Sequence, residues 1–308
     1  MTTPADRLSV LSIQSHVVHG MVGNKAATFP LQLHGVDVDP LNVVRFSNHT
    51  GYKVFKGSRM PVEEFNSVIE GLRANNILGS YTAILSGYVG NAAVLEAIHK
   101  TVIEAKGIAP TKYLCDPVIG DNGKMYVPEE VVEVYRQMMT DADMVTPNGF
   151  EASVVSQVEI TSIETAIECA DWFHAQGVQI AVIKSFELDD APGVIHLLGS
   201  KKIATDGDDD DESAPKFERY LIRVPKQDYY FTGTGDCFSA IFLAQWMTKF
   251  EECGFKSVLE TSVAAIQNVL KMTDELRVDV TGKKELSIVA SAQLILNPTF
   301  ECQTERLA

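Results

Sequence analysis

Four consecutive residues in the last third of the chain, Gly233-Thr234-Gly235-Asp236, have the types and order needed to handle a phosphate group. They stand at the start of a helix-like pattern, where glycines let the backbone approach a ligand closely. The free N–H groups of a helix start bind anions. Asp236 falls in the first turn, where the helix dipole favours its ionised form. The segment therefore indicates an anion hole beside a carboxylate that can take a proton from a hydroxyl group.

Taken alone, this segment is also consistent with an ordinary helix N-terminus capped by an aspartate. It is not a G-x-x-x-x-G-K-[ST] loop, because that spacing is missing from the sequence. The H-R-D and V-A-I-K signatures of protein kinases are missing as well. A nicotinamide-dependent oxidoreductase would need G-x-G-x-x-G after an early strand, whereas this glycine turn comes late and lacks the third glycine.

Charge and composition narrow the class of protein. The formal net charge is -15, so the chain repels phosphate backbones and nucleic acid is not an expected partner. No apolar run reaches the roughly 18 residues of a membrane span, and the N-terminus lacks the pattern of a signal peptide. The five cysteines show no C-x-x-C spacing, which favours reduced thiols. We expect a cytosolic protein that does not interact with membranes.

Apolar strand-like runs alternate with amphipathic helix-like stretches along the 308 residues. This alternation predicts an α/β fold with a central, mainly parallel sheet between layers of helices. The predicted strands include 8–14, 38–46, 81–86, 112–116, 143–146 and 179–184. The predicted helices include 23–34, 62–75, 91–106, 128–139, 163–176, 234–249, 256–272 and 287–296. Pro61 and Pro128 are expected at the first helical position. Finding no clean linker, we expect one domain over residues 1–308.

Polar side chains follow several of the predicted strands. They include Ser15, Tyr88, Asp116 and Asn148. Ligands of open parallel sheets bind beyond the carboxyl ends of the strands, so a site is expected there. The acidic run at 205–213 (TDGDDDDES) interrupts the pattern and is expected to be a solvated surface loop.

Several blocks, together with the glycine turn, closely resemble the pyridoxal kinases of the ribokinase-like superfamily. They are Leu11–His16 (LSIQSH), Val22–Ala27 (VGNKAA), Arg45–Tyr52 (RFSNHTGY), Ser86–Tyr88 (SGY), Cys115–Asp121 (CDPVIGD), Met125–Glu129 (MYVPE) and Thr146–Glu151 (TPNGFE). The resemblance covers nearly the whole chain, and the LSIQSH and RFSNHTGY blocks are the most specific. It implies a ribokinase-like three-layer fold. It also implies ATP-dependent phosphorylation of the 5′-hydroxymethyl group of pyridoxal, pyridoxine or pyridoxamine.

The resemblance also implies roles for individual residues on the vitamer side. Asp236 matches the base that deprotonates the hydroxymethyl group, and Gly233, Thr234 and Gly235 match the anion hole. The positions that match the substrate pocket are Ser15, Val22, His49, Thr50 and Tyr88. A hydroxyl and a polar-tipped aromatic suit a flat ring that needs both apolar contact and hydrogen bonds.

On the nucleotide side, the matching positions are Asp116, Asn148, Glu151, Lys184, Ser185, Gln227, Asp228, Tyr229 and Thr234. Asp121 and Glu151 match a Mg²⁺ site, whose ion prefers oxygen ligands and bridges to phosphates. Thr146 and Lys184 match the site of a monovalent cation, K⁺ or Na⁺. Lys184 departs from the family, which carries a small hydroxyl residue there; the lysine supplies charge near the phosphates or displaces the cation. A homodimer is also implied.

Two other functions remain open at this point. One is a related kinase that acts on hydroxymethylpyrimidine or a sugar, which the RFSNHTGY block argues against. The other is a regulatory protein that binds the vitamer without catalysis, which the intact Asp236 and the Asn148-x-x-Glu151 pair argue against. A substrate panel separates the first from a pyridoxal kinase, and ADP release separates the second.

Overall fold

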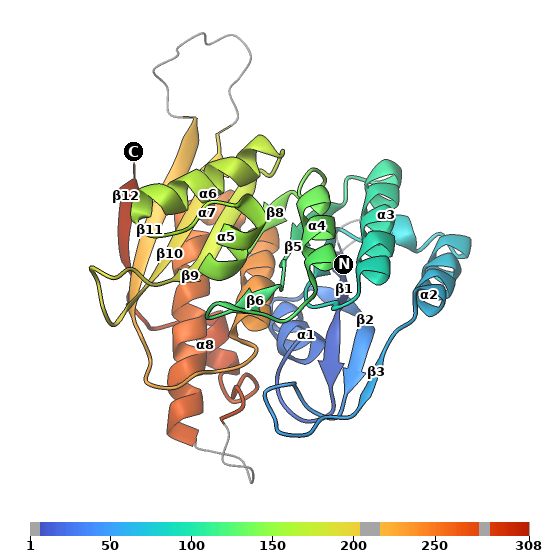
Figure 1. Ribbon diagram of the computed structural model, residues 1–308, viewed down its shortest axis with the longest axis horizontal. Coiled ribbons are helices and arrows are strands. Elements are labelled where there is room, and N and C mark those ends of the chain that lie inside the picture. Colours follow the sequence, from blue (N-terminus) through green and yellow to red (C-terminus); the bar gives the residue numbers. More distant parts are fainter. Residues whose placement is uncertain (1–6, 204–215, 277–283, 308) are drawn as a thin grey trace.

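A ten-stranded sheet organises the computed structural model, which describes residues 7–203, 216–276 and 284–307 (Figure 1). Its strand order is β12-β11-β10-β9-β8-β5-β4-β1-β2-β3. The strands are β1 (Ser9–Val17), β2 (Asp37–Phe46), β3 (Gly57–Arg59), β4 (Ala83–Ser86), β5 (Lys112–Cys115), β8 (Met144–Val145), β9 (Ile180–Phe186), β10 (Val194–Lys202), β11 (Phe217–Pro225) and β12 (Gln303–Leu307). The two short strands β6 (Gly120–Asp121) and β7 (Lys124–Met125) form a separate hairpin.

The centre of the sheet is parallel and its two edges are antiparallel. The strands from β2 through β1, β4, β5 and β8 to β9 pair in parallel. At one edge β3 runs antiparallel to β2, and at the other β10, β11 and β12 continue the sheet antiparallel from β9. The predicted mainly parallel centre is confirmed, whereas the antiparallel edges were not predicted.

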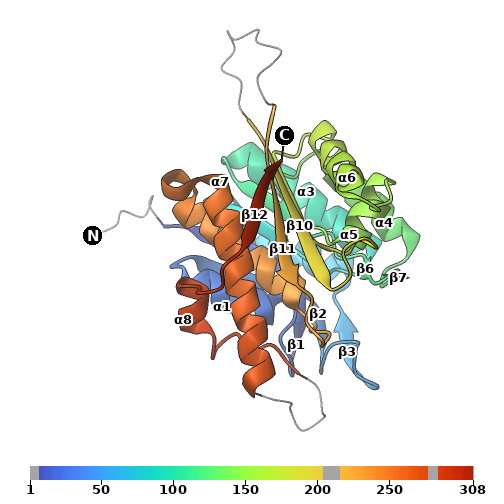
Figure 2. The same cartoon turned by 90° about the vertical axis from the view of Figure 1, so that its left-hand side faces the viewer.

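Helices cover both faces of the sheet, as expected for parallel strands buried on both sides. One face carries α1 (Asn24–Leu33), α7 (Thr234–Leu276) and α8 (Ala292–Leu296). The other carries α2 (Val62–Ala74), α3 (Ala92–Ile108), α4 (Glu129–Met138), α5 (Gly149–Ser156) and α6 (Ile163–Ala175), with a 3-10 turn at Leu78–Ser80. Figure 2 shows the two layers with the strands between them. Side chains alternate along β1, so Leu11 and Ile13 enter one core and Val10 the other. The predicted three-layer architecture is confirmed.

Most helix limits lie within two residues of the prediction, but three details differ. Pro61 and Pro128 stand at the N-cap positions of α2 and α4, one residue before the predicted place. The predicted helix 287–296 is only α8. The two helices predicted at 234–249 and 256–272 are the two halves of α7, which breaks at Gly254 because its φ of 74° is not helical. The predicted acidic loop, 205–213, lies outside the described residues.

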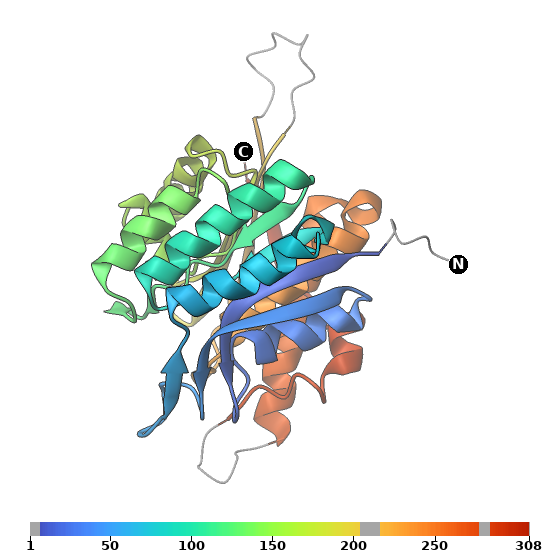
Figure 3. The same ribbon diagram turned by 90° about the vertical axis from the view of Figure 1, so that its right-hand side faces the viewer.

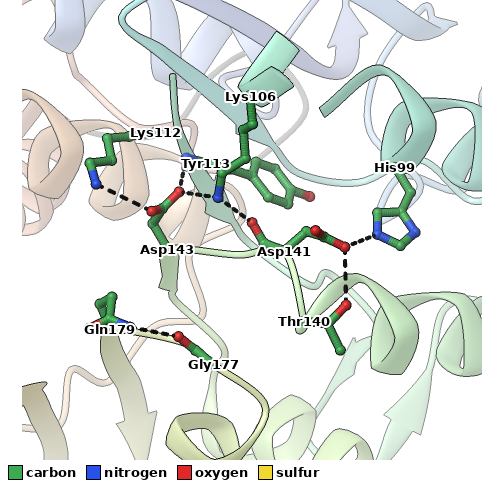
Figure 4. A network of polar contacts seen from close by, with 9 residues as sticks. All are labelled: His99, Lys106, Lys112, Tyr113, Thr140, Asp141, Asp143, Gly177 and Gln179. Carbon is green, nitrogen blue, oxygen red and sulfur yellow. Dashed lines mark hydrogen bonds and ion pairs between the residues drawn. The ribbon is translucent and has the colours of Figure 1, made fainter. Parts of the chain in front are cut away.

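A polar network joins the amino ends of the central strands, on the edge of the sheet away from the strand tips (Figure 4). Asp143, just before β8, accepts hydrogen bonds from Lys106 Nζ and from the Tyr113 N–H, both at 2.8 Å. Asp141 accepts one from His99 Nε2 at 2.7 Å. The network ties α3 and β5 to the segment before β8, and we assign it a structural role.

The carboxyl ends of the strands meet at a topological switch point. From β1 the chain adds β2 on one side, and then β4, β5, β8 and β9 on the other. Figure 3 shows the blue edge with β1, β2 and β3 from the side opposite the C-terminal strands. Open α/β sheets bind ligands where the strand order reverses in this way. The tips of β1 and β4 are therefore the natural floor of a site.

Candidate active site

A cleft of about 1490 Å³ opens over the strand tips. It is lined by every predicted site residue except Thr146: Ser15, Val22, His49, Thr50, Tyr88, Asp116, Asp121, Asn148, Glu151, Lys184, Ser185, Gln227, Asp228, Tyr229, Gly233, Thr234, Gly235 and Asp236. Thr146 is fully buried below the floor, where its hydroxyl lies 2.8 Å from that of Ser239. Residues predicted from blocks far apart in the sequence are thus brought together in one cavity.

Two of the residues predicted to bind the vitamer, Ser15 and Val22, lie where β1 ends and just before α1 begins. The pairing of β1 with β2 shifts register between Gln14 and Ser15, and Ser15 beside this irregularity is buried. Gly23 follows at the start of α1 with φ of 55°, and a Cβ there would stand 2.1 Å from the Ser15 carbonyl oxygen. Only glycine allows this approach. The turn before α1 therefore packs directly onto the strand tip that carries Ser15.

The glycine turn predicted to form an anion hole stands at the start of α7. Gly233 adopts φ of 88°, and a Cβ there would stand 1.9 Å from the carbonyl oxygen of Met21. The Gly233 carbonyl accepts the N–H of Cys237 at 3.0 Å, which closes the first turn. The N–H groups of Thr234, Gly235 and Asp236 belong to that turn and have no carbonyl partner within the helix. Gly233, Thr234, Gly235 and Asp236 all line the cleft.

Asp236 is held beside this turn by a residue more than two hundred positions away. The N–H of Gly23 donates to Asp236 Oδ2 at 2.8 Å. Burial raises the pKa of Asp236 to about 6, and the nearby carboxylate of Asp116 adds to the rise. The Gly23 N–H and the Lys184 ammonium act in the opposite direction. A base with a pKa just below neutrality is ionised at pH 7 yet basic enough to accept a proton.

Lys184, at the end of β9, places an ammonium group at the centre of the acidic residues. Its Nζ lies 2.5 Å from Asp116 Oδ1, and the exposed fractions of the two side chains are 9% and 2%. Asp116 Oδ2 accepts the hydroxyl of Ser239 at 2.8 Å. Burial alone would lower the pKa of Lys184, but the charges of Asp116, Glu151 and Asp236 outweigh burial and raise it. The group is therefore a permanent cation.

The side chain of Lys184 is not a ligand for the monovalent cation predicted here. A cation needs oxygen ligands, whereas the ammonium of Lys184 only donates hydrogen bonds and repels a second cation. The hydroxyl of the other predicted ligand, Thr146, forms a hydrogen bond with the hydroxyl of Ser239 below the floor of the cleft. A Cβ on Gly235 would lie 2.9 Å from Lys184 Nζ, so the ammonium already sits against the anion hole.

The Asn148-x-x-Glu151 pair caps α5, a helix that the sequence did not predict. Asn148 Oδ1 accepts the N–H of Glu151 at 2.8 Å, and Glu151 Oε2 accepts the N–H of Asn148 at the same distance. Glu151 Oε1 also accepts the N–H of Ile119 at 3.1 Å. Burial raises the pKa of Glu151. This reciprocal capping box fixes both side chains at the cleft wall, next to the β6–β7 hairpin.

The hairpin and the loop after β11 form the rim of the cleft. Asp121 lies in the hairpin, and the hydroxyls of Tyr126 and Tyr230 lie 3.4 Å apart across the two segments. Gln227, Asp228 and Tyr229 are exposed along the loop. Within the described ranges, no group of three or more His, Cys, Asp or Glu side chains could hold a metal ion. Asp121 and Glu151 nevertheless suit Mg²⁺, which commonly takes one or two carboxylates and completes its shell with phosphates and water.

Two residues next to the site had no signal in the sequence. Ser239 stands one turn after Gly235 and Asp236, and it joins Asp116 to Thr146. Glu285 comes from the segment before α8 and reaches the far wall of the vitamer side. Serine and glutamate are common in helices and loops, and only the fold brings these two to the cleft. Cys237 is fully buried, and burial raises the pKa of its thiol.

Comparison with known proteins agrees with this geometry. The sequence profile of the phosphomethylpyrimidine kinase family matches residues 64–273. Pyridoxal kinase of Arabidopsis thaliana is 40% identical over 99% of this chain and 97% of its own length. Pyridoxal kinase of Homo sapiens is 40% identical over 86% of this chain and 85% of its own length.

Solved structures extend the likeness to three dimensions. Pyridoxal kinase of Leishmania donovani in complex with ADP and pyridoxine has a TM-score of 0.86 at 40% identity, covering 99% of this chain and all of that one (100%). Pyridoxal kinase of Trypanosoma brucei has a TM-score of 0.83 at 38% identity, covering 98% of this chain and 100% of its own.

Proposed function

The chain belongs to the pyridoxal kinase family, and from this premise we propose that its cleft transfers the terminal phosphoryl group of ATP to the 5′-hydroxymethyl group of a B6 vitamer. Pyridoxal, pyridoxine and pyridoxamine are the acceptors, and ADP with the 5′-phosphate are the products. The observation that carries the proposal is the carboxylate of Asp236, held by the Gly23 N–H beside the glycine turn. That arrangement supplies a proton acceptor and an anion hole at the same point.

The vitamer is proposed to bind over the tips of β1 and β4. Ser15 can donate to or accept from a polar atom of the pyridine ring. Tyr88, Val22, His49 and Thr50 supply the apolar and polar walls that a flat ring needs. This arrangement directs the hydroxymethyl group toward Asp236, which accepts its proton as the oxygen attacks phosphorus.

The nucleotide is proposed to occupy the other half of the cleft. The N–H groups of Thr234 and Gly235 would donate hydrogen bonds to the oxygens of the transferring phosphoryl group, on which negative charge develops. The strand end at Lys184-Ser185 and the loop Gln227–Tyr229 would line the phosphate and adenosine parts. Asp116 and Asn148 complete this side. Positioning and charge compensation are what the protein must supply, because in-line transfer needs little covalent chemistry from it.

We propose that Asp121 and Glu151 hold Mg²⁺ together with the phosphates of ATP. When bound, the ion neutralises charge on the phosphate oxygens. This assignment is supported by the position of both residues on the wall of the cleft.

For the monovalent cation we propose the second of the two alternatives, that Lys184 takes its place. The ion pair with Asp116 and the closeness of Lys184 Nζ to Gly235 support a fixed positive charge at the phosphoryl site. Of the two predicted cation ligands, only Thr146 has an oxygen in its side chain, and that hydroxyl lies 2.8 Å from the hydroxyl of Ser239. Catalysis by this chain should therefore need no added K⁺ or Na⁺.

Assembly and location are further proposals. We propose that the whole chain is one functional unit, since the sheet carries both β1 and β12. A homodimer is supported by exposed apolar side chains beside the end of β1, with Val18 76%, Val54 64% and Phe55 40% exposed.

Cytosolic residence is supported by five unpaired cysteines. In the described residues no helix is long and apolar enough to cross a membrane.

The test is ADP release with each B6 vitamer and, because of the family profile, with hydroxymethylpyrimidine. The wild type should turn over the vitamers in the presence of ATP and Mg²⁺. Asp236→Asn should lose about 10²–10⁴-fold in kcat because the proton acceptor is gone, while ATP still binds. Near-normal turnover by this variant would remove Asp236 from its role, and preference for hydroxymethylpyrimidine would redirect the substrate assignment.

A further inference from the structure

Glu285 lies behind the wall of the vitamer side without lining the cleft, and its carboxylate gathers three hydrogen-bond donors. Oε1 is 2.7 Å from the hydroxyl of Tyr52 and 3.0 Å from Nε2 of His49. Oε2 accepts the N–H of Met21 at 3.0 Å. The exposed fraction of the Glu285 side chain is only 14%. Both oxygens of a nearly buried carboxylate are therefore engaged with residues that flank the predicted vitamer pocket.

The contacts of His49 define which of its ring nitrogens carries a proton. The N–H of Gly51 points at Nδ1 from 3.2 Å, so Nδ1 accepts. Nε2 must then carry the hydrogen and donate it to Glu285. Glu285 thus fixes both the tautomer and the orientation of a ring that lines the cleft.

Glu285 also contacts the turn that leads into α1. Gly20 has φ of 100°, and a Cβ there would stand 2.8 Å from Glu285 Oε2, so the turn is wrapped closely around the carboxylate. Three residues after Gly20, the N–H of Gly23 donates to Asp236. Between them, the carbonyl of Met21 packs against Gly233 of the anion hole. One short turn therefore connects Glu285 to the proposed base and to the glycine turn.

The segment that carries Glu285 is itself anchored. Lys284 forms an ion pair with Asp274 of α7, and its Nζ stands 3.6 Å from the centre of the Tyr229 ring. Leu286 and Ile288 are buried in the core beneath α7. Burial alone would raise the pKa of Glu285, but hydrogen bonds from His49, Tyr52 and Met21 outweigh burial and lower it to about 2. The carboxylate is thus a fixed, ionised reference point.

We propose that Glu285 is a positioning residue of the kinase reaction, holding His49 for the vitamer and the turn at residues 20–23 for Asp236. The inference rests on the proposed function and deepens it, because it names a determinant of vitamer binding that touches no substrate. Its effect must pass through His49 and through the Gly23–Asp236 hydrogen bond. Vitamer binding and turnover should therefore depend on Glu285 much more than ATP binding does.

The main variant is Glu285→Gln, which keeps the shape of the side chain. A carboxamide has one acceptor oxygen, whereas three donors face this site, so its NH₂ group must confront at least one of them. Hydrogen bonds to charged groups are worth enough to predict a fall of about 10- to 100-fold in kcat/KM for the vitamer. KM for ATP should change by less than about threefold. Glu301→Gln makes the same chemical change at an exposed position and should match the wild type.

A second variant guards against loss of folding in the first. Tyr52→Phe removes only one donor to Glu285 and does not alter a residue that lines the cleft. It should lower kcat/KM for the vitamer by about 3- to 10-fold. In the double variant, the loss should be smaller than the sum of the two single losses, because the Tyr52–Glu285 hydrogen bond counts in both. Additive losses, or equal losses in the KM values of vitamer and ATP, would indicate a merely structural role and overturn the proposal.

Vitamer dissociation constants, measured by fluorescence quenching in the same variants, keep this proposal separate from the proposed function. A wild type that turns over no vitamer defeats the proposed function. Unchanged dissociation constants and unchanged kcat/KM in the soluble variants defeat the positioning role of Glu285, whatever the wild type phosphorylates.

Discussion

Replacing Lys184 with threonine should turn the chain into an enzyme that responds to K⁺. An oxygen bound to the Gly235 N–H would lie on the order of 5 Å from the ammonium, since a Cβ on Gly235 would stand 2.9 Å from it. At an effective dielectric constant of about 20, two unit charges about 5 Å apart interact by roughly 3 kcal/mol. Loss of that interaction in the transition state corresponds to about 10²-fold in kcat.

The assay compares initial rates of ADP release in KCl and in tetramethylammonium chloride at equal ionic strength. The wild type should be indifferent to the cation. Lys184→Thr should be slow in tetramethylammonium and partly restored by K⁺, because the threonine hydroxyl adds an oxygen ligand beside Asp116. Lys184→Met has a similar length without an oxygen, so it should be slow in both salts.

Melting temperatures give a reading of cation binding that does not depend on turnover. K⁺ should stabilise Lys184→Thr, since a ligand that binds the folded state raises its stability, and should leave the wild type and Lys184→Met unchanged. Strong activation of the wild type by K⁺ would refute the reasoning, because the fixed ammonium would then not be the cation that catalysis uses.

Two further predictions follow from the contacts around Asp236 and Ser15. The pKa of Asp236 is about 6 and only its ionised form accepts a proton, so kcat/KM should fall about tenfold per pH unit below about pH 6. Lys184→Met removes a charge that lowers this pKa, so the acid limb of its pH profile should lie at higher pH. An acid limb that does not move would contradict the assignment. Ser15→Ala should raise KM for the vitamer roughly 3- to 10-fold through loss of one hydrogen bond; an effect on KM for ATP alone would mean that Ser15 faces the other half of the cleft.

The centre of the fold could be predicted because its signals are local. Alternating apolar runs give β1, β2, β4, β5 and β9, and helical spacing gives both halves of α7. The strands β10, β11 and β12 were missed because an antiparallel edge is defined by pairing between segments rather than by any one of them. Helix α5 was missed because its first residues were interpreted only as chemistry, although Asn148 and Glu151 are also its capping box.

The site divides in the same way. Residues that follow strands or open helices, such as Ser15, Asp116 and Asp236, could be placed at one cleft because parallel strands end on one side of a sheet. The partners that fix those residues could not be foreseen. Gly23 reaches Asp236 because α1 and α7 pack side by side on the same face. Ser239 reaches Asp116 because the start of α7 lies against the end of β5.

The hydrogen bond between Gly23 and Asp236 spans 213 positions of the chain, and the one between Met21 and Glu285 spans 264. A polypeptide emerging from the ribosome can pair β1 with β2 and β4 long before residue 236 has been made, since N-terminal parts fold first during synthesis. It lacks the proposed proton acceptor until α7 follows, and the turn at Met21 is not fastened until residue 285 has been made. Unfinished or prematurely terminated chains should therefore be unable to phosphorylate the vitamer with ATP, however much of the sheet they have formed.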